Sequence, residues 1–253
     1  MIKIVIVIPS FNEEKNIIAT LKTILLQISN YKDYSFQLIV LDDFSTDESL
    51  LLLNKFKDDT FNDLQIISNS INKGIVKSTK KLFEEALKSK ADFILKCDMD
   101  SDFPHAIFLD TFINYIKESQ PNFDEILVGE RQIENVITQS TLEIQERVKM
   151  ERYLNENLNI KNYNPVSSGV LLYGKNVLKT VLQQQVVKEY NLKWGLDFLL
   201  PLVAIKLNYK VIKSKVNNGT YTKERRPKSK IKAQYSAYYH ILNIIKNTYQ
   251  QNI

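Results

Sequence analysis

Residues 2–8 read IKIVIVI, a nearly continuous run of β-branched apolar residues. A run without polar alternation is typical of a central strand in a parallel sheet that helices cover on both faces. Apolar residues then recur with helical spacing over residues 17–28, and strand-like and helical patterns alternate further along the chain, at 36–41, 47–56, 64–67, 76–87 and 93–97. This alternation predicts an α/β protein with a mostly parallel central sheet flanked by helices.

The second half of the chain is less regular. We expect strands at 126–129, 169–173 and 210–212, helices at 141–157 and 197–207, and a long terminal helix. Residues 216–228 contain Gly, Asn, Pro and basic residues without periodicity, which predicts a mobile loop. With 253 residues and 44% apolar content, the chain can bury one sizeable core, so a single domain over residues 1–253 is expected.

The composition excludes several classes of protein. Cys97 is the only cysteine, so the chain has no internal disulfide and no cysteine-based zinc site. No apolar run reaches the roughly 18 residues that a membrane span needs, and the apolar stretch near the N-terminus is too short for a signal peptide. We therefore expect a cytoplasmic protein, with peripheral contact at the inner membrane face left open.

The net charge of +5 is unevenly distributed. Residues 206–253 carry 11 Lys and Arg against the lone acid Glu224, whereas the first 205 residues carry more acids than bases. A basic end of this kind suits nucleic acid, anionic lipid or a phosphorylated substrate, and charge does not choose among them. An apolar and tyrosine stripe on the terminal helix favours packing onto the domain or a second subunit, so a homodimer is one option.

Three expected strands end in acidic or polar segments, at residues 9–14, 42–47 and 98–102. Ligands of open parallel sheets bind beyond the carboxyl ends of the strands, so these segments are expected to form one site. Asp98 and Asp100 are two residues apart and project to the same side of an extended backbone. Such a pair suits Mg²⁺ or Mn²⁺ bound to a diphosphate, and acidic capping of a helix that starts near Pro104 is the alternative.

The ordered blocks IVIPSFNEE (6–14), VLDDFSTD (40–47), NKG (72–74) and DMD (98–100) resemble the nucleotide-sugar half of GT-A fold, family 2 glycosyltransferases. The resemblance implies a nucleotide-sugar-binding half over 1–128 and an acceptor-binding half over 129–253. It implies donor contacts from Pro9, Phe11, Glu13, Asp42, Asp43, Lys73 and Asp98, and metal ligation by Asp98 and Asp100. Phe11 stands where the family more often has Tyr, and Phe44 where it more often has Gly.

In the second half, GER (129–131), NPVSSG (164–169), NYKV (208–211) and ERRPKSK (224–230) follow the order seen in dolichyl-phosphate and polyprenyl-phosphate mannosyltransferases. This similarity implies that Arg131, Ser168, Arg225 and Arg226 bind the acceptor, the arginines through its phosphate. Trp194 is a candidate for stacking on a sugar or acceptor, with packing at a core edge as the commoner role of such a residue.

Glycosyl transfer builds negative charge on the leaving diphosphate, so a divalent cation held by Asp98 and Asp100 lowers the barrier as a Lewis acid. An alcohol acceptor also needs a base, and Asp197 is the candidate, with helix capping as its alternative role. A phosphate acceptor needs no base. We expect an inverting hexosyltransferase that uses a UDP- or GDP-sugar.

The leading acceptor is a polyprenyl phosphate, and the alternative is a sugar hydroxyl of a surface polysaccharide or glycolipid. A nucleotidyltransferase is a further alternative, but it would be expected to have a Gly-rich, basic loop after its first strand, and this chain has the acidic segment 12–14 there. A nucleic-acid partner is not expected, because it would leave the acids unexplained, whereas a non-catalytic nucleotide-sugar binder stays open.

Overall fold

The computed structural model describes residues 1–99, 108–119, 123–131, 141–161, 163, 167–216 and 228–249. In this part of the chain one seven-stranded sheet has the strand order β3-β2-β1-β4-β6-β5-β7. The strands are β1 (Ile2–Ser10), β2 (Tyr34–Asp42), β3 (Leu64–Ser68), β4 (Phe93–Lys96), β5 (Glu125–Arg131), β6 (Ser167–Gly174) and β7 (Lys210–Val216). β6 runs antiparallel to its neighbours β4 and β5, and the other pairs are parallel. The mostly parallel sheet is thus confirmed.

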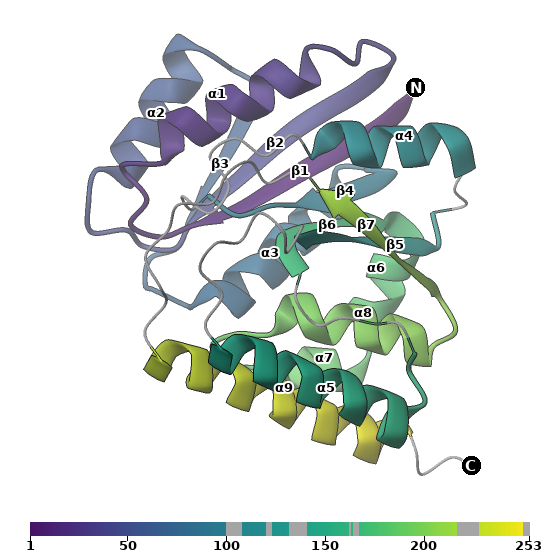
Figure 1. The fold of residues 1–253 in the computed structure, drawn as a ribbon. Helices are drawn as coiled ribbons and strands as arrows, with labels where there is room; N and C mark the ends of the chain where they lie inside the picture. The colour runs from purple at the N-terminus through teal and green to yellow at the C-terminus, as the bar shows by residue number, and fades with distance from the viewer. Residues whose placement is uncertain are drawn as a thin grey trace.

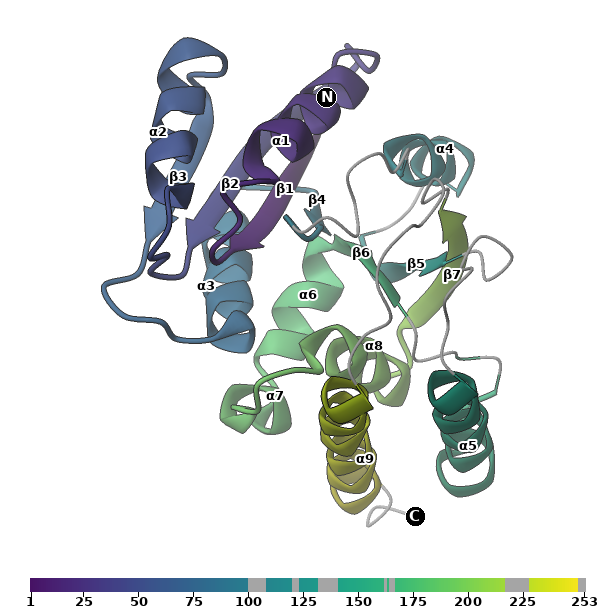
Figure 2. The same ribbon diagram turned by 60° about the vertical axis from the view of Figure 1, so that its left-hand side comes forward.

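Helices cover both faces of the sheet (Figures 1 and 2). They are α1 (Ile17–Ile28), α2 (Ser49–Asp59), α3 (Ile75–Lys88), α4 (Leu109–Ser119), α5 (Thr141–Leu158), α6 (Lys175–Leu182), α7 (Gln185–Glu189), α8 (Leu196–Lys206) and α9 (Lys228–Tyr249). Core residues of α1, α2 and α4 pack on one face, and those of α3, α6 and α8 pack on the other. Helices α5 and α9 lie side by side beyond α8 (Figure 1).

The apolar run at the N-terminus forms the central strand that the sequence predicts. Residues 4–8 of β1 are fully buried, and their side chains alternate between the two cores. Val5 and Val7 belong to the core that contains α3 and α8, whereas Ile4, Ile6 and Ile8 belong to the core that contains α1 and α4. A strand with both faces apolar is stable only where helices cover both sides, as they do here.

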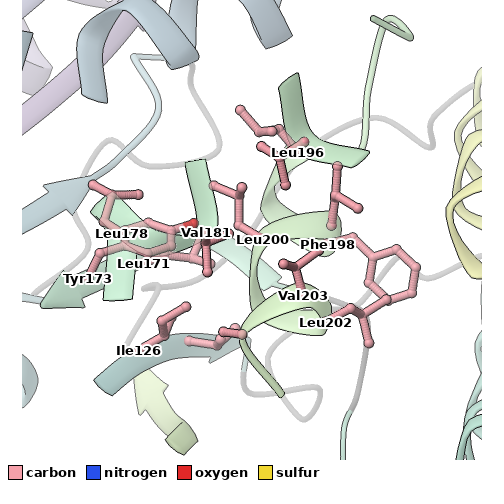
Figure 3. Packing of buried hydrophobic residues seen from close by; sticks show 14 of the residues in the cluster. Ile126, Leu171, Tyr173, Leu178, Val181, Leu196, Phe198, Leu200, Leu202 and Val203 are labelled. Carbon is pink, nitrogen blue, oxygen red and sulfur yellow. The ribbon is translucent and has the colours of Figure 1, made fainter. Parts of the chain in front are cut away.

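Helix α8 is buried along most of its length and packs directly on the sheet (Figure 3). Leu200 and Val203 belong to the same core cluster as Tyr173 of β6 and Ile126 of β5. The helix begins after Gly195, whose φ of +104° is a left-handed conformation that suits glycine. The first turn of α8, which contains Asp197, is therefore held in a fixed place against the sheet.

Several details differ from the sequence-based expectation. The described part of the helix expected near Pro104 begins at Leu109, where the Gln27 side chain accepts hydrogen bonds from the backbone N–H groups of Phe108 and Leu109. Helices α6 and α7 were not predicted.

The division expected between residues 128 and 129 falls inside β5. The loop predicted at residues 216–228 lies outside the described residues except at its two ends. Among the described helices, none is long and apolar enough to cross a membrane.

Candidate active site

A cleft of about 400 Å³ opens at the carboxyl ends of β1, β2 and β4. The loop before α8 and the start of α3 complete its wall. Its lining residues are Pro9, Ser10, Phe11, Glu13, Asp43, Asn72, Gly74, Ile75, Ser78, Asp98, Met99, Lys193 and Trp194. The acids that follow separate strands therefore share one cleft, as their positions at the strand ends predict.

Asp43 shapes one wall of this cleft. Its Oδ1 accepts hydrogen bonds from Asn69 Nδ2 at 2.8 Å and from the backbone N–H of Lys73 at 2.9 Å. Its Oδ2 accepts one from the backbone N–H of Gly74 at 2.8 Å. Asn72 and Gly74 line the cleft, whereas the Lys73 residue is largely exposed. Asp43 thus holds the turn that places Asn72 and Gly74 on the cleft wall.

Asp42 lies behind the cleft wall rather than on it. It is buried, and its Oδ2 accepts the backbone N–H of Ser45 at 3.1 Å. Its Oδ1 and the hydroxyl of Ser10, which faces Asp42 in the β1–β2 register, are buried without a partner among the described residues. Because buried polar atoms are usually hydrogen-bonded, Ser10 on the cleft wall is suited to a polar group of a ligand.

The loop after β1 is tied to the loop after β2. The backbone N–H of Asn12 donates to Ser45 Oγ at 2.9 Å, and Asn12 Oδ1 accepts the backbone N–H of Thr46 at 2.8 Å. The backbone N–H of Glu13 donates to Ser49 Oγ at 2.8 Å. These bonds hold the Phe11 and Glu13 segment at the rim of the cleft. Phe44, at a position where glycine is commoner, adopts a left-handed φ of +65°.

A buried lysine joins two of the predicted site acids, Asp98 and Asp197. Lys96 Nζ lies 2.6 Å from Asp98 Oδ1 and 2.7 Å from Asp197 Oδ2. Both distances end on the same nitrogen, so the two carboxylate oxygens cannot be further apart than the sum of these distances. Asp98 and Asp197 therefore lie in one site, although 99 positions separate them in the sequence. Sequence reasoning missed Lys96, and its only signal there is the two-residue spacing from Asp98.

The charges of this group are mutually dependent. Burial favours a lower pKa for Lys96, but Asp197 and Asp98 outweigh it and hold that pKa above its ordinary value. Burial, reinforced by Asp98 and opposed by Lys96, raises the pKa of Asp197, which suits a proton acceptor. Burial also raises the pKa of the Cys97 thiol, in keeping with an inert core cysteine.

The segment before α8 contributes Lys193 and Trp194 to the cleft wall. Trp194 lines the cleft as expected for a stacking residue, and Lys193 Nζ lies 4.8 Å from the centre of its ring. The Tyr190 hydroxyl donates to the carbonyl oxygen of Trp194 and steadies the segment. The capping alternative for Asp197 is wrong, because the N-cap of α8 is Gly195 and Asp197 lies inside the first turn.

Other predicted site residues lie beyond what the structure describes. Asp100, Arg225 and Arg226 fall outside the described residues. Arg131 and Ser168 lie on β5 and β6, but the placement of their side chains is not described. Their roles stay predictions.

Comparisons with known proteins agree with this geometry. A family model described as glycosyl transferase family 2 matches residues 5–172. Poly(ribitol-phosphate) β-N-acetylglucosaminyltransferase TarP of Staphylococcus aureus is 31% identical over 137 residues, which are 53% of this chain and 38% of the relative. Poly(ribitol-phosphate) β-glucosyltransferase of Bacillus spizizenii is 34% identical over 119 residues, 47% of this chain and 18% of the relative. The matched segments thus span less than half of either relative.

Among solved structures, glucosyl-3-phosphoglycerate synthase from Mycobacterium tuberculosis, in complex with Mn²⁺, UDP and glucosyl-3-phosphoglycerate, is similar in fold. Its TM-score is 0.63 at 16% identity, and the match covers 97% of this chain and 80% of that one. This likeness confirms the GT-A fold that the sequence blocks predict. Because the family model covers most of the chain, and Glu13, Asp43 and Asp98 from three of the blocks line one cleft, the chain belongs to glycosyl transferase family 2.

Proposed function

We propose that this protein transfers a sugar from a nucleotide-diphosphate sugar to a hydroxyl group of a glycan or polyol-phosphate acceptor, with inversion at the anomeric carbon. The observation that carries the proposal is that Lys96 Nζ bonds both Asp98, which lines the cleft, and Asp197, which lies in the first turn of α8, three residues after the cleft-lining Trp194. In this arrangement Asp197 accepts the proton of the attacking hydroxyl. A phosphate acceptor, being already anionic, would leave the placement of Asp197 without a purpose.

The donor nucleoside is assigned to the wall formed by Pro9, Phe11 and Asp43, and the unpartnered Ser10 hydroxyl offers it a further polar contact. A UDP-sugar is the donor we propose first, because the solved relative named above holds UDP. In this proposal residues 1–128 supply most of the donor side, and residues 129–253 supply the acceptor side.

A divalent cation fits the acidic end of the cleft. Lys96 uses Oδ1 of Asp98, and this carboxylate is 31% exposed and lines the cleft, so it can offer oxygen to Mg²⁺ or Mn²⁺. Asp98 would hold the cation together with Asp100, which the structure leaves undescribed, and within the described ranges no set of three ligating side chains gathers. When bound, such a cation neutralises charge on the leaving diphosphate as a Lewis acid.

The acceptor is proposed by analogy with the two poly(ribitol-phosphate) glycosyltransferases, which are named for a polymer that offers hydroxyl groups. This reverses the order expected from the sequence, where a polyprenyl phosphate comes first. Arg131, Arg225 and Arg226 would carry a polyprenyl-phosphate acceptor, so that alternative becomes an outcome of the test.

The first experiment is a thermal-shift panel of UDP-, GDP-, CDP- and dTDP-sugars with and without Mn²⁺. A rise in melting temperature for one nucleotide that requires Mn²⁺ supports the donor site, and no response to any of the four would refute it. The responding donor is then offered poly(ribitol phosphate) or a polyprenyl phosphate.

Two variants then distinguish the acceptors. Asp197→Asn is expected to slow transfer to the hydroxyl acceptor about 10²- to 10⁴-fold, whereas Arg225→Ala changes it little. The matched control is Asp58→Asn, which replaces an exposed carboxylate on α2. Transfer to the polyprenyl phosphate that survives Asp197→Asn and is lost in Arg225→Ala would replace the hydroxyl proposal with its rival.

A further inference from the structure

We infer that Lys96 is a positioning residue that fixes the separation between the metal-binding acid and the catalytic base. This inference rests on the proposed function and adds to it a residue that touches neither substrate. In this role Lys96 aligns the anomeric carbon of the donor with the attacking hydroxyl by holding the two carboxylates that face them.

The ammonium group of Lys96 has three N–H donors, and three acceptors from different parts of the fold surround it. Asp98 Oδ1 follows β4, Asp197 Oδ2 lies in the first turn of α8, and the carbonyl oxygen of Gly169, at 3.3 Å, lies on β6. Each donor can therefore be used, which leaves the nitrogen no second orientation of equal quality. Lys96 therefore links three segments of the fold: the residues after β4, the first turn of α8 and β6.

The backbone of Lys96 is also held in place by the sheet. It is the last residue of β4, in the middle of the sheet, and pairs with Val7 of β1 and Leu171 of β6. Because alternate residues of an extended chain project to the same side, Lys96 and Asp98 are expected on one side of the strand. The backbone of Lys96 is thus held on both sides by the neighbouring strands β1 and β6.

The exposure of the three side chains separates their roles. The Lys96 side chain is 3% exposed, whereas those of Asp98 and Asp197 are 31% and 26% exposed. Lys96 bonds one oxygen of each carboxylate, so each acid presents its other oxygen without breaking the ion pair. The lysine lies behind the two acids, which makes it a support for reacting groups rather than one of them.

The surroundings leave little to replace Lys96. Tyr173 on β6 is fully buried, and Tyr163 stacks on Phe198, the residue after Asp197, with 6.1 Å between the ring centres. Without the lysine cation, two carboxylates held this close repel each other and move apart. A shift of about 1 Å between reacting groups can cost roughly 10²-fold in rate.

The test compares Lys96→Met, Asp197→Asn and the double variant, with Lys175→Met as the matched control. Lys175 also pairs with an aspartate, Asp92 at 2.8 Å, at the opposite end of β4 from Lys96. We expect Lys96→Met to lower kcat about 10²-fold while the donor KM changes by less than about threefold. Lys175→Met should leave both parameters unchanged. Because part of the effect of Lys96 passes through Asp197, the loss in the double variant should be smaller than the product of the two single losses.

Structural readouts keep the test independent of turnover. Crystal structures of Lys96→Met and the wild type should show a longer distance between the carboxylates of Asp98 and Asp197 in the variant. If Lys96→Met does not fold, the double variant is compared with Asp197→Asn. The distance from the Asp98 carboxylate to the side chain at position 197 should be longer in the double variant, and an unchanged distance would overturn the positioning role.

The outcomes separate this inference from the proposed function. Wild-type turnover in Lys96→Met, unmoved carboxylates, or a loss in the double variant that multiplies the two single losses would overturn the positioning role while leaving Asp197 as the base. Wild-type turnover in Asp197→Asn would instead overturn the proposed function. If Asp197→Asn and Lys96→Met are each slow, and the loss in the double variant is smaller than the product of the two single losses, the proposed function and the positioning role are both supported.

Discussion

Replacing Asp43 tests whether this carboxylate builds the turn at residues 72–74. In Asp43→Ala three donors lose their acceptor: Asn69 Nδ2 and the backbone N–H groups of Lys73 and Gly74. Their losses are unequal. Lys73 is exposed, so water can take over its N–H group, and Gly74 retains a second acceptor in Asn72 Oδ1 at 3.1 Å. Asn69 Nδ2 also retains Ser78 Oγ at 3.1 Å, which serves one of its two N–H groups, but Asn69 is 5% exposed, so water does not readily reach the other.

These contacts set the expected magnitude. A buried donor left without a partner costs about 1 to 3 kcal/mol, and losing a bond to a charged group in the exposed turn costs less where water replaces it. We therefore expect Asp43→Ala to lower the free energy of unfolding by about 3 kcal/mol. Asp43→Asn can retain the oxygen that serves Asn69 and Lys73 and loses only the bond to Gly74, so we expect about 1 kcal/mol.

The assay is urea unfolding followed by circular dichroism, with Asp58→Ala on the exposed side of α2 as the control, expected within about 0.5 kcal/mol of the wild type. At this chain length, 3 kcal/mol corresponds to a decrease of roughly 6 to 12 °C in melting temperature. An Asp43→Ala variant that loses less than about 1 kcal/mol, or an Asp43→Asn variant that loses as much as Asp43→Ala, would refute this account of the turn.

Three further predictions concern the cleft and the edges of the sheet. Gly195→Ala should lose more stability in urea unfolding than Gly74→Ala: both have positive φ, but a Cβ meets side-chain atoms at 2.6 and 2.8 Å in the first and open space in the second. An equal loss would argue against close packing before α8. Ser10→Ala should leave the melting temperature of the free protein unchanged or higher, because the hydroxyl has no described partner, and should weaken donor affinity in calorimetry; unchanged affinity would remove Ser10 from the donor site. Burial alone would raise the pKa of Asp92, but hydrogen bonds from Lys175 and a backbone N–H outweigh it and lower that pKa. The ionised Asp92 therefore stabilises the folded state at pH values above its ordinary pKa of about 4, and this stabilisation is lost as the pH falls through the lowered pKa. The stability gap between the wild type and Lys175→Met, measured by urea unfolding from pH 7 to pH 2, should therefore close at the acid end, and a gap that is constant with pH would contradict this.

Much of the donor side could be predicted from the sequence because its signals are local. The apolar run at residues 2–8 is long enough to identify a central strand, and acids directly after a strand must lie at its carboxyl end. Asp43 and Asp98 consequently line the cleft, as predicted. Their detailed partners were not predictable, because Asp43 bonds Asn69, which lies beyond the next helix and strand.

The acceptor side carries weaker local signals. An apolar strand such as β6 has no mark of its direction, so the sequence does not show that it runs antiparallel. A lysine at the end of a strand resembles one that reaches solvent, and the second acid that pairs with Lys96 lies 101 residues later. Only the tertiary fold shows that this lysine is buried between two carboxylates.

The position of β6 beside β4 limits how this protein can be recombined with its relatives. A crossover placed at residue 128 would cut β5 and would pair β4 of one parent with β6 of the other, so the packing between these two apolar strands would no longer be matched. Such a chimaera would also receive the partner of Lys96 from a different parent. Exchanges of acceptor specificity should therefore be made as loop grafts onto an intact β4–β6–α8 unit, with Lys96, Gly169 and Asp197 retained from one parent.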